Sequence, residues 1–190
     1  GKSGCMGDIG THALNLAEYV TGLRVTELCA DLSIMVNGRQ LDDDGNVLVR
    51  FDNGARGIIY ASQVSAGEEN GLRIRVYGEK GGIEWVQAEP NRMEVKWTDR
   101  PMEVKKPGNP YLSDIAQYNT RMPAGHPEGL IEAFANIYRN VATSIQHKLE
   151  GKAPPAEALD FPGVHDGLRG MQFIDRLIES NGSQGKWTKF

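Results

Sequence analysis

The stretch GNVLVRFDNGARGIIYASQV, residues 45–64, decides the fold of this chain. Two runs rich in Val, Leu, Ile and Tyr flank the break Asp52-Asn53-Gly54. β-Branched and aromatic residues favour strands, and Asn-Gly supplies the positive φ that a tight turn requires. The stretch therefore predicts a β-hairpin of two antiparallel strands.

The same composition recurs on both sides of this hairpin. The other strand-like stretches are residues 23–36, 72–86, 92–97 and 101–106. Residues 72–86 contain their own turn at Gly78–Gly82, and Leu72, Ile74 and Val76 alternate with polar neighbours, so we expect one face of this strand to lie on a core. Successive hairpins of this kind predict an antiparallel meander.

Helical periodicity appears before and after the strands. Apolar residues recur at helical spacing in residues 11–20, 127–149 and 163–180, and Gly22 stands where a helix C-cap is expected. We expect the 127–149 helix to pack on the sheet and the tail, residues 185–190, to add a short strand. This order predicts an α+β domain: a predominantly antiparallel open sheet with helices packed on one face.

Composition excludes several classes of function. The chain has 190 residues and a formal net charge of −4 with scattered basic residues, which argues for one domain and against a nucleic-acid partner. No apolar stretch is long enough to cross a membrane. Cys5 and Cys29 are too few for a disulfide framework, so we expect reduced thiols and a cytoplasmic protein. Because no initiator Met precedes Gly1, we interpret the chain as a fragment.

The first candidate for chemistry is the pair Asp8 and His12 in GDIGTH, residues 7–12. A spacing of four places both side chains on one side of a helix, where the carboxylate can orient the imidazole. Histidine, with an ordinary pKa of about 6.5, both accepts and returns protons near neutral pH. The pair therefore fits general acid–base catalysis, and the alternative is that Asp8 caps the helix while His12 packs.

The remaining histidines carry weaker signals. His126, in GHPEG at residues 125–129, precedes a helix start and can face a hydroxylated or anionic ligand, or be a loop histidine without one. We interpret His147 as a solvated residue late in a helix, where the helix dipole favours its charge. His165 can cap the last helix or lie near a cleft, and for it too we favour the interpretation without a ligand. Asp8, His12 and His126 lack a zinc spacing, so no metal site is predicted. No glycine-rich phosphate-binding motif is present, so no cofactor site is expected in this chain.

Five stretches in order resemble the C-terminal domain of the Gfo/Idh/MocA oxidoreductases, and the resemblance runs from about Gly4 to Trp187. They are GDIGTHALNLAEYVTG, FDNGARGIIYASQVSAG, NGLRIRVYGEKGGIEW, GHPEGLIEAFANIYRNV and DGLRGMQFIDRLIESNGSQGKW. The resemblance implies that residues 1–190 form a C-terminal substrate-binding and oligomerisation domain. An N-terminal Rossmann domain, absent from this chain, would hold NAD or NADP and a lysine beside the substrate.

The resemblance also implies site residues and partners. Asp8 and His12 fall on the family's catalytic D-x-x-x-H pair, in which the imidazole accepts the alcohol proton as hydride leaves for the nicotinamide. The pattern Arg121-x-Pro-Ala-Gly-His126 is similar to that of members acting on sugars, anhydrosugars and inositols, so Arg121 and His126 are implied hydroxyl contacts. His165 replaces the acid usual at its place. Members associate into homo-oligomers through the open face of the sheet.

Two hypotheses remain open at this point. The first is an NAD(P)-dependent dehydrogenase of sugars or polyols, of which this fragment alone is inactive. The second is a non-catalytic sugar-binding or assembly domain of a related protein. Trp85 can offer a flat apolar surface to a sugar ring or be a core residue, and the sequence does not choose between these roles.

Overall fold

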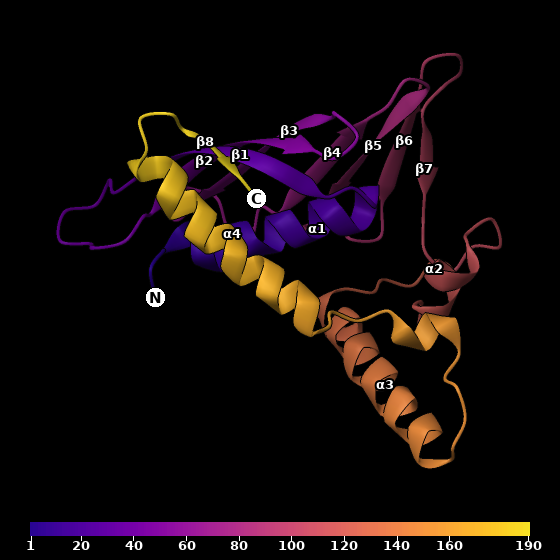
Figure 1. Cartoon of the computed structure of the whole chain (residues 1–190). Coiled ribbons are helices and arrows are strands. Elements are labelled where there is room, and N and C mark those ends of the chain that lie inside the picture. Colours follow the sequence, from indigo (N-terminus) through magenta and orange to yellow (C-terminus); the bar gives the residue numbers. More distant parts are fainter. The chain divides into compact units, whose positions relative to one another are not determined.

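The computed structural model describes all residues, 1–190, and Figure 1 labels its helices and strands. The chain divides into two compact units. Unit 1 comprises residues 1–69 and 163–190, and unit 2 comprises residues 70–162. The elements of unit 1 are η1 (Met6–Gly10), α1 (Thr11–Thr21), β1 (Val25–Ser33), β2 (Asp44–Phe51), β3 (Arg56–Ser62), α4 (Val164–Gly182) and β8 (Trp187–Lys189). Those of unit 2 are β4 (Arg73–Tyr77), β5 (Gly81–Val86), β6 (Met93–Trp97), β7 (Glu103–Lys105), α2 (Asp114–Tyr118), α3 (Leu130–Leu149) and η2 (Ala156–Leu159).

Unit 1 is built on an antiparallel sheet with the strand order β3-β2-β1-β8. The predicted hairpin is confirmed: β2 pairs with β3 in the register Val49 opposite Gly57, and Gly54 has a φ of 89° in the turn. The tail also forms its predicted strand, because β8 pairs with β1 with Leu28 opposite Thr188.

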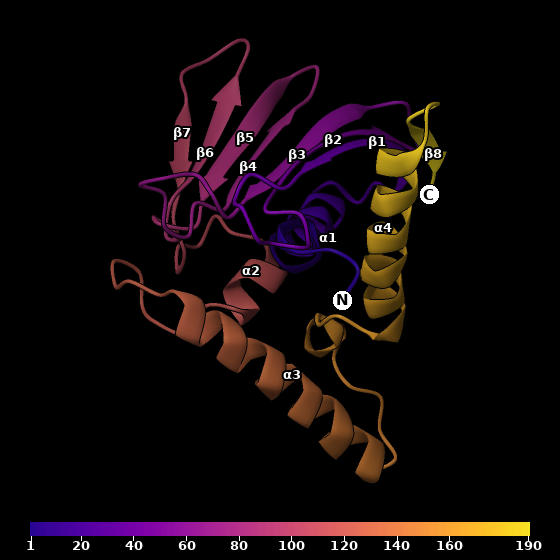
Figure 2. The same ribbon diagram turned by 90° about the vertical axis from the view of Figure 1, so that its left-hand side faces the viewer.

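One face of this sheet carries the core of the chain. The helices α1 and α4 lie on that face (Figure 2), and both contribute buried residues. The alternation of β1, β2 and β3 sends every second side chain inward, as expected for a sheet covered on one side. The core residues are Cys5, Met6, Leu14, Val25, Leu28, Ala30, Val47, Val49, Ile59, Ala61, Phe173 and Leu177.

The opposite face of the same sheet is open and carries an apolar row. Ile58, Leu48, Cys29 and Trp187 lie opposite one another across all four strands. Ile58 is 72% exposed and Leu48 is 48% exposed. Beside this row, Arg50 pairs with Glu27 at 2.7 Å and its guanidinium lies 3.8 Å from the centre of the Trp187 ring.

Unit 2 contains a second antiparallel sheet with the order β4-β5-β6-β7. Val76, Ile83 and Val95 occupy opposing positions on β4, β5 and β6, so they share one face of this sheet. The predicted alternation of Ile74 and Val76 is thus correct, although both are only half-buried. The turn at 78–82 joins β4 to β5, as predicted.

The long helix α3 packs differently from the prediction. Its neighbour within unit 2 is η2 rather than a strand. The reason is a polar stripe, in which Asn136, Asn140 and Ser144 donate to the backbone carbonyls of Asn119, Asp160 and Ala158. The predicted apolar stripe is exposed, with Ile131 at 81%.

The predicted fold class is confirmed, and the boundaries need small corrections. The chain is α+β, and its strands form two open antiparallel sheets of four strands each. Helix α3 begins at Leu130 rather than at residue 127, because Glu132 accepts the backbone N–H of Gly129 and caps the helix there. The short helices α2 and η2 were not predicted. None of the helices has both the length and the apolar character to span a membrane.

Candidate active site

Asp8 and His12 lie on one continuous helical segment in unit 1. Asp8 is in the π-helical turn η1, and His12 is in the first turn of α1. Both residues are exposed, and no hydrogen bond or ion pair engages either side chain. Single π-helical turns are rare and are frequent at functional sites. The two groups are therefore available to a ligand, while the expected orienting contact between them is not formed in this structure.

A buried carboxylate fixes the N-terminal end of this segment. Asp42 Oδ1 accepts hydrogen bonds from Gly4 N at 2.7 Å and Ser3 Oγ at 2.8 Å, and Oδ2 accepts Met6 N at 2.9 Å. Burial alone would raise the pKa of Asp42, but these hydrogen bonds outweigh it and the pKa lies below its ordinary value. Asp42 thus satisfies backbone N–H groups that a helix start leaves without partners.

Three glycines allow the π-helical turn η1 to pack closely on its neighbours. A Cβ added at Gly10 would lie 2.6 Å from Met6 Cε, and one at Gly45 would lie 2.5 Å from Met6 Cγ. A Cβ at Gly4 would lie 2.2 Å from the carbonyl oxygen of Asp42. Because Met6 is fully buried, the π-helical turn is packed against β2 without space for further side-chain atoms.

An ion-pair network holds the C-terminal half of α1. Glu18 is 6% exposed and pairs with Arg169 of α4 and with Arg24. Burial would raise the pKa of Glu18, but its bonds to Arg169, to the Val25 N–H and to Arg24 lower it below its ordinary value. The helix that carries His12 is thereby fixed at both ends.

In unit 2, Arg121 and His126 belong to one loop, residues 121–128. Both are exposed, and Nδ1 of His126 lies 3.2 Å from the carbonyl oxygen of Pro123. Desolvation, followed by repulsion from Arg139, lowers the pKa of Arg121 from its ordinary value. The two predicted residues thus lie in one loop of unit 2, as Asp8 and His12 lie on one helical segment of unit 1.

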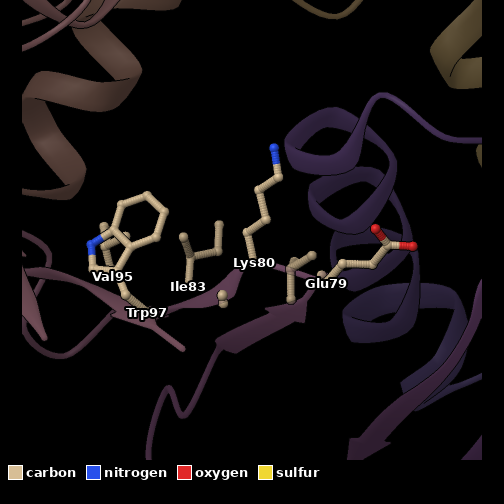
Figure 3. Close-up of a pocket in the computed structure, with 9 residues that line it drawn as sticks. Glu79, Lys80, Ile83, Val95 and Trp97 are labelled. Carbon is tan, nitrogen blue, oxygen red and sulfur yellow. The ribbon is translucent and has the colours of Figure 1, made fainter. Parts of the chain in front are cut away.

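Trp85 lies on β5 of unit 2, where its indole N–H donates to the carbonyl of Pro90 at 3.1 Å. A pocket lies beside another tryptophan, Trp97 on β6 (Figure 3). This pocket has a volume of about 500 Å³, and Figure 3 shows Trp97, Val95 and Ile83 on the same side of the sheet as Lys80. Sequence reasoning missed it, because the residues that line it are distributed over β4, β5 and β6 and form no continuous motif.

The structure has no group of three His, Cys, Asp or Glu side chains that could hold a metal ion. It also offers no dinucleotide cradle, because every paired strand is antiparallel and no parallel βαβ unit is present.

The other histidines and the cysteines occupy ordinary positions. His147 Nδ1 lies 2.9 Å from the carbonyl of Thr143 one helical turn earlier, and His165 is exposed in the first turn of α4. Both cysteines are free. Burial and the neighbouring Asp42 raise the pKa of Cys5 to about 12, so its thiol is a packing group rather than a nucleophile.

Sequence reasoning missed the residues that hold the candidate site. Asp42 stands in the run Asp42-Asp43-Asp44, three consecutive acids that lead into the predicted strand at residue 45, and this run was the available signal. In the structure Asp42 and Asp43 are buried. Arg169 lies in a stretch that carried the family resemblance, but the sequence does not tell which acid it meets. Distant partners of this kind become visible only in the fold.

Comparison with known proteins finds one family that matches part of the chain. A family described as GFO/IDH/MocA C-terminal domain matches residues 2–84. The chain is similar to the C-terminal domain of the Gfo/Idh/MocA oxidoreductases. The resemblance seen in the sequence is thus confirmed, and it is as a C-terminal domain that the family description matches.

Relatives of known structure share the whole fold. An oxidoreductase from Sinorhizobium meliloti is 44% identical over 97% of this chain and 52% of its own, with a TM-score of 0.91. An inositol dehydrogenase homolog from Azotobacter vinelandii, complexed with NADH and myo-inositol, is 31% identical over 100% of this chain and 51% of its own, with a TM-score of 0.90. The uncharacterised oxidoreductase YfiI of Bacillus subtilis is 32% identical over 100% of this chain and 49% of its own. The chain thus spans about half the length of these relatives.

Proposed function

We propose that this chain is the substrate-binding half of an NAD(P)-dependent oxidoreductase that acts on a sugar, anhydrosugar or inositol-type polyol. The observation that carries the proposal is the likeness to a homolog complexed with NADH and myo-inositol, which extends over the whole chain. The exposed, unengaged pair Asp8 and His12 supports it, because a general base must be free to reach a substrate hydroxyl.

The proposed roles concern proton transfer. His12 accepts the proton of the substrate hydroxyl through its imidazole, and Asp8 stabilises the resulting imidazolium from the preceding turn. In the reverse direction the same imidazole returns the proton to a carbonyl oxygen. The nicotinamide exchanges the hydride. A Rossmann domain preceding this chain is proposed to bind it, a proposal supported by relatives that are about twice as long.

Substrate contacts are proposed for three residues of unit 2. Arg121 and His126 suit the hydroxyl groups of a polyol, since one offers donors and the other a ring nitrogen. Trp85 is proposed to offer an apolar surface to the sugar ring. Its half-buried position on β5 supports this, because part of the side chain packs on the protein and part stays exposed. The cofactor preference, NAD or NADP, is left to experiment.

A second copy of the protein is the proposed macromolecular partner. The open face of the unit 1 sheet offers the apolar row Ile58, Leu48, Cys29 and Trp187, and exposed apolar surface of this kind favours association. The row is bordered on one side by Arg56 and by the ion pair of Arg50 with Glu27, and on the other side by Asp31. We propose a cytoplasmic homo-oligomer, consistent with the two free cysteines.

The competing function is a sugar-binding or assembly domain without catalysis. The experiment that separates the two uses the full-length gene product, screened against polyols, monosaccharides and anhydrosugars with NAD⁺ and with NADP⁺. An increase in the absorbance of reduced nicotinamide with at least one substrate supports the dehydrogenase. Polyol binding by calorimetry without turnover under any condition would favour the binding domain.

A further inference from the structure

The loop 121–128 is closed on itself by Glu128. One carboxylate oxygen, Glu128 Oε1, accepts the backbone N–H of Arg121 at 2.6 Å and also that of Met122. Hydrogen bonds from backbone N–H groups to a carboxylate are charge-assisted and stronger than neutral ones. The side chain of Glu128, the last residue of the loop, therefore binds the backbone of the first two residues. This closure restricts the movement of the residues between them.

A second residue fixes this closure to the sheet. Asn91, in the turn between β5 and β6, donates from Nδ2 to the carbonyl of Glu128 at 2.7 Å and accepts the Glu128 N–H on Oδ1 at 2.9 Å. Both backbone groups of Glu128 are thus satisfied by one side-chain amide. Only an amide side chain offers a donor and an acceptor side by side in this way, so the match is specific to Asn or Gln.

Inside the closed loop a backbone carbonyl lies within hydrogen-bond distance of the His126 imidazole. Its Nδ1 lies 3.2 Å from the carbonyl oxygen of Pro123, which accepts hydrogen bonds and donates none. This contact favours the neutral tautomer with the proton on Nδ1, which leaves a lone pair on Nε2. Gly125, with a φ of 85°, and the backbone bond from His126 N to Pro123 O at 3.1 Å shape the turn that holds the ring there.

The neighbouring loop packs against the same turn. A Cβ added at Gly108 would lie 2.8 Å from the backbone nitrogen of Ala124, so the backbones approach closely at this point. Gly108 also has a φ of 73°, a conformation that favours glycine. The turn that carries His126 is therefore supported on a second side, although all of these residues lie in irregular structure.

We propose that Asn91 and Glu128 are positioning residues that lock the loop 121–128 and present Nε2 of His126 as a hydrogen-bond acceptor for a substrate hydroxyl. This proposal rests on the proposed function. It adds residues that the family resemblance did not assign, and it names the hydrogen-bonding role of His126. Neither Asn91 nor Glu128 touches the substrate in this account, since both act through the loop.

The test combines kinetics with amide exchange. In the full-length protein, His126→Ala is expected to raise KM for the polyol about 5- to 10-fold with a smaller change in kcat, which corresponds to one lost hydrogen bond. Asn91→Ala is expected to raise KM similarly and to add little in the His126→Ala background, because both changes remove the same contact. Glu128→Gln keeps the accepting oxygen and is expected to stay near the wild type, whereas Glu128→Ala is expected to behave like Asn91→Ala.

Hydrogen exchange in the 190-residue chain provides a readout that needs no activity. Asn91→Ala should accelerate exchange at the amides of Arg121, Met122 and Glu128. The matched control is Gln117→Ala, which removes an exposed amide bonded to the Leu112 carbonyl in the same unit and should leave these rates and KM unchanged.

The outcomes separate the two proposals. A wild-type protein that is inactive on every polyol overturns the proposed function, and the role given to His126 with it. An active protein in which His126→Ala raises KM while Asn91→Ala does not, or in which the two effects multiply, overturns the positioning role alone. Unchanged exchange at Arg121 and Met122 in Asn91→Ala overturns the lock itself.

Discussion

Arg169 on α4 and Glu18 on α1 form a two-point ion pair: Nε of Arg169 lies 2.7 Å from Oε2 of Glu18, and Nη2 lies 2.5 Å from Oε1. The same guanidinium donates to the Val25 carbonyl at 2.7 Å and stacks 4.1 Å from the centre of the Phe190 ring. One side chain therefore connects two helices, the start of β1 and the C-terminal residue. This pair fixes the helix that carries His12 onto the core of unit 1.

Removing Arg169 should cost stability because Glu18 would keep its charge in a buried position. Arg24 and the Val25 N–H remain as partners, so we expect Arg169→Met to lower the free energy of unfolding by about 2–3 kcal/mol, below the 3–5 kcal/mol typical of a fully abandoned buried charge. Urea denaturation of the chain at pH 7 measures this. Arg176→Met, which breaks the exposed pair with Glu179 on the same helix, is the control and should cost under about 1 kcal/mol. Equal losses in the two variants would contradict the account.

The stability of the chain should fall in acid through Asp42. Its pKa is lower in the folded state than its ordinary value, so its hydrogen bonds contribute stability above the unfolded-state pKa of about 3.9. That contribution is lost as the pH falls through the folded-state pKa. We expect the free energy of unfolding to be level from pH 5 to 7 and to decrease below about pH 4.

The variant Asp42→Asn isolates this effect. The amide nitrogen it introduces cannot accept the Met6 N–H, so the variant should be less stable at pH 7 by about 1–3 kcal/mol and less sensitive to acid than the wild type. Denaturation at pH 7 and at pH 3 gives both quantities. An acid dependence unchanged by the substitution would exclude Asp42 as its source.

Glycine substitutions should change stability in opposite directions at two sites. Gly4→Ala would bring a Cβ within 2.2 Å of the Asp42 carbonyl oxygen, so the backbone must shift and the variant should be clearly destabilised. Gly167→Ala, inside α4, meets nothing within 4 Å and should stabilise the chain by about 0.5–1 kcal/mol through helix propensity. Thermal unfolding of both variants checks the signs. A stabilising Gly4→Ala would refute the close packing of this loop on Asp42.

Association should depend on the open face of the unit 1 sheet. Leu48 is 48% exposed at the middle of the apolar row, so Leu48→Lys should leave folding intact and weaken self-association at least tenfold. Sedimentation velocity over a concentration series measures this. Val20→Lys, at a 39% exposed site on α1, serves as the control and should associate like the wild type. Undiminished association of Leu48→Lys would place the interface elsewhere.

Much of the fold follows from local patterns. Alternation and turn chemistry predicted β2 with β3, and β4 with β5, because hairpin partners are close in sequence and Gly54 and Gly78 mark the turns. The division into two four-stranded sheets was not predicted, since strand composition does not tell where pairing stops. The packing of α3 was wrongly predicted because its contacts are made by Asn136, Asn140 and Ser144 through backbone carbonyls, a pattern that apolar periodicity does not detect.

For the candidate site, too, local features were predicted and contacts between distant residues were not. The spacing of Asp8 and His12 was sufficient to predict one helical segment, and the family resemblance supplied its chemistry. The π-helical turn, the Asp42 contacts and the pair Asn91–Glu128 were not predicted, because each depends on residues that are brought together only by folding. His126 and Arg121 were predicted as contacts, and their role stays a prediction.

The central claim is that His12 moves the substrate proton, and the direct measurement is the steady-state turnover of His12→Gln in the full-length protein with its preferred polyol and cofactor. We expect kcat to fall about 10²- to 10⁴-fold, as for other general bases, with KM for the nicotinamide within about twofold of the wild type. His147→Gln, which changes a histidine bonded to the Thr143 carbonyl, should keep full activity. A His12→Gln enzyme with wild-type kcat would remove His12 from the mechanism and contradict the account.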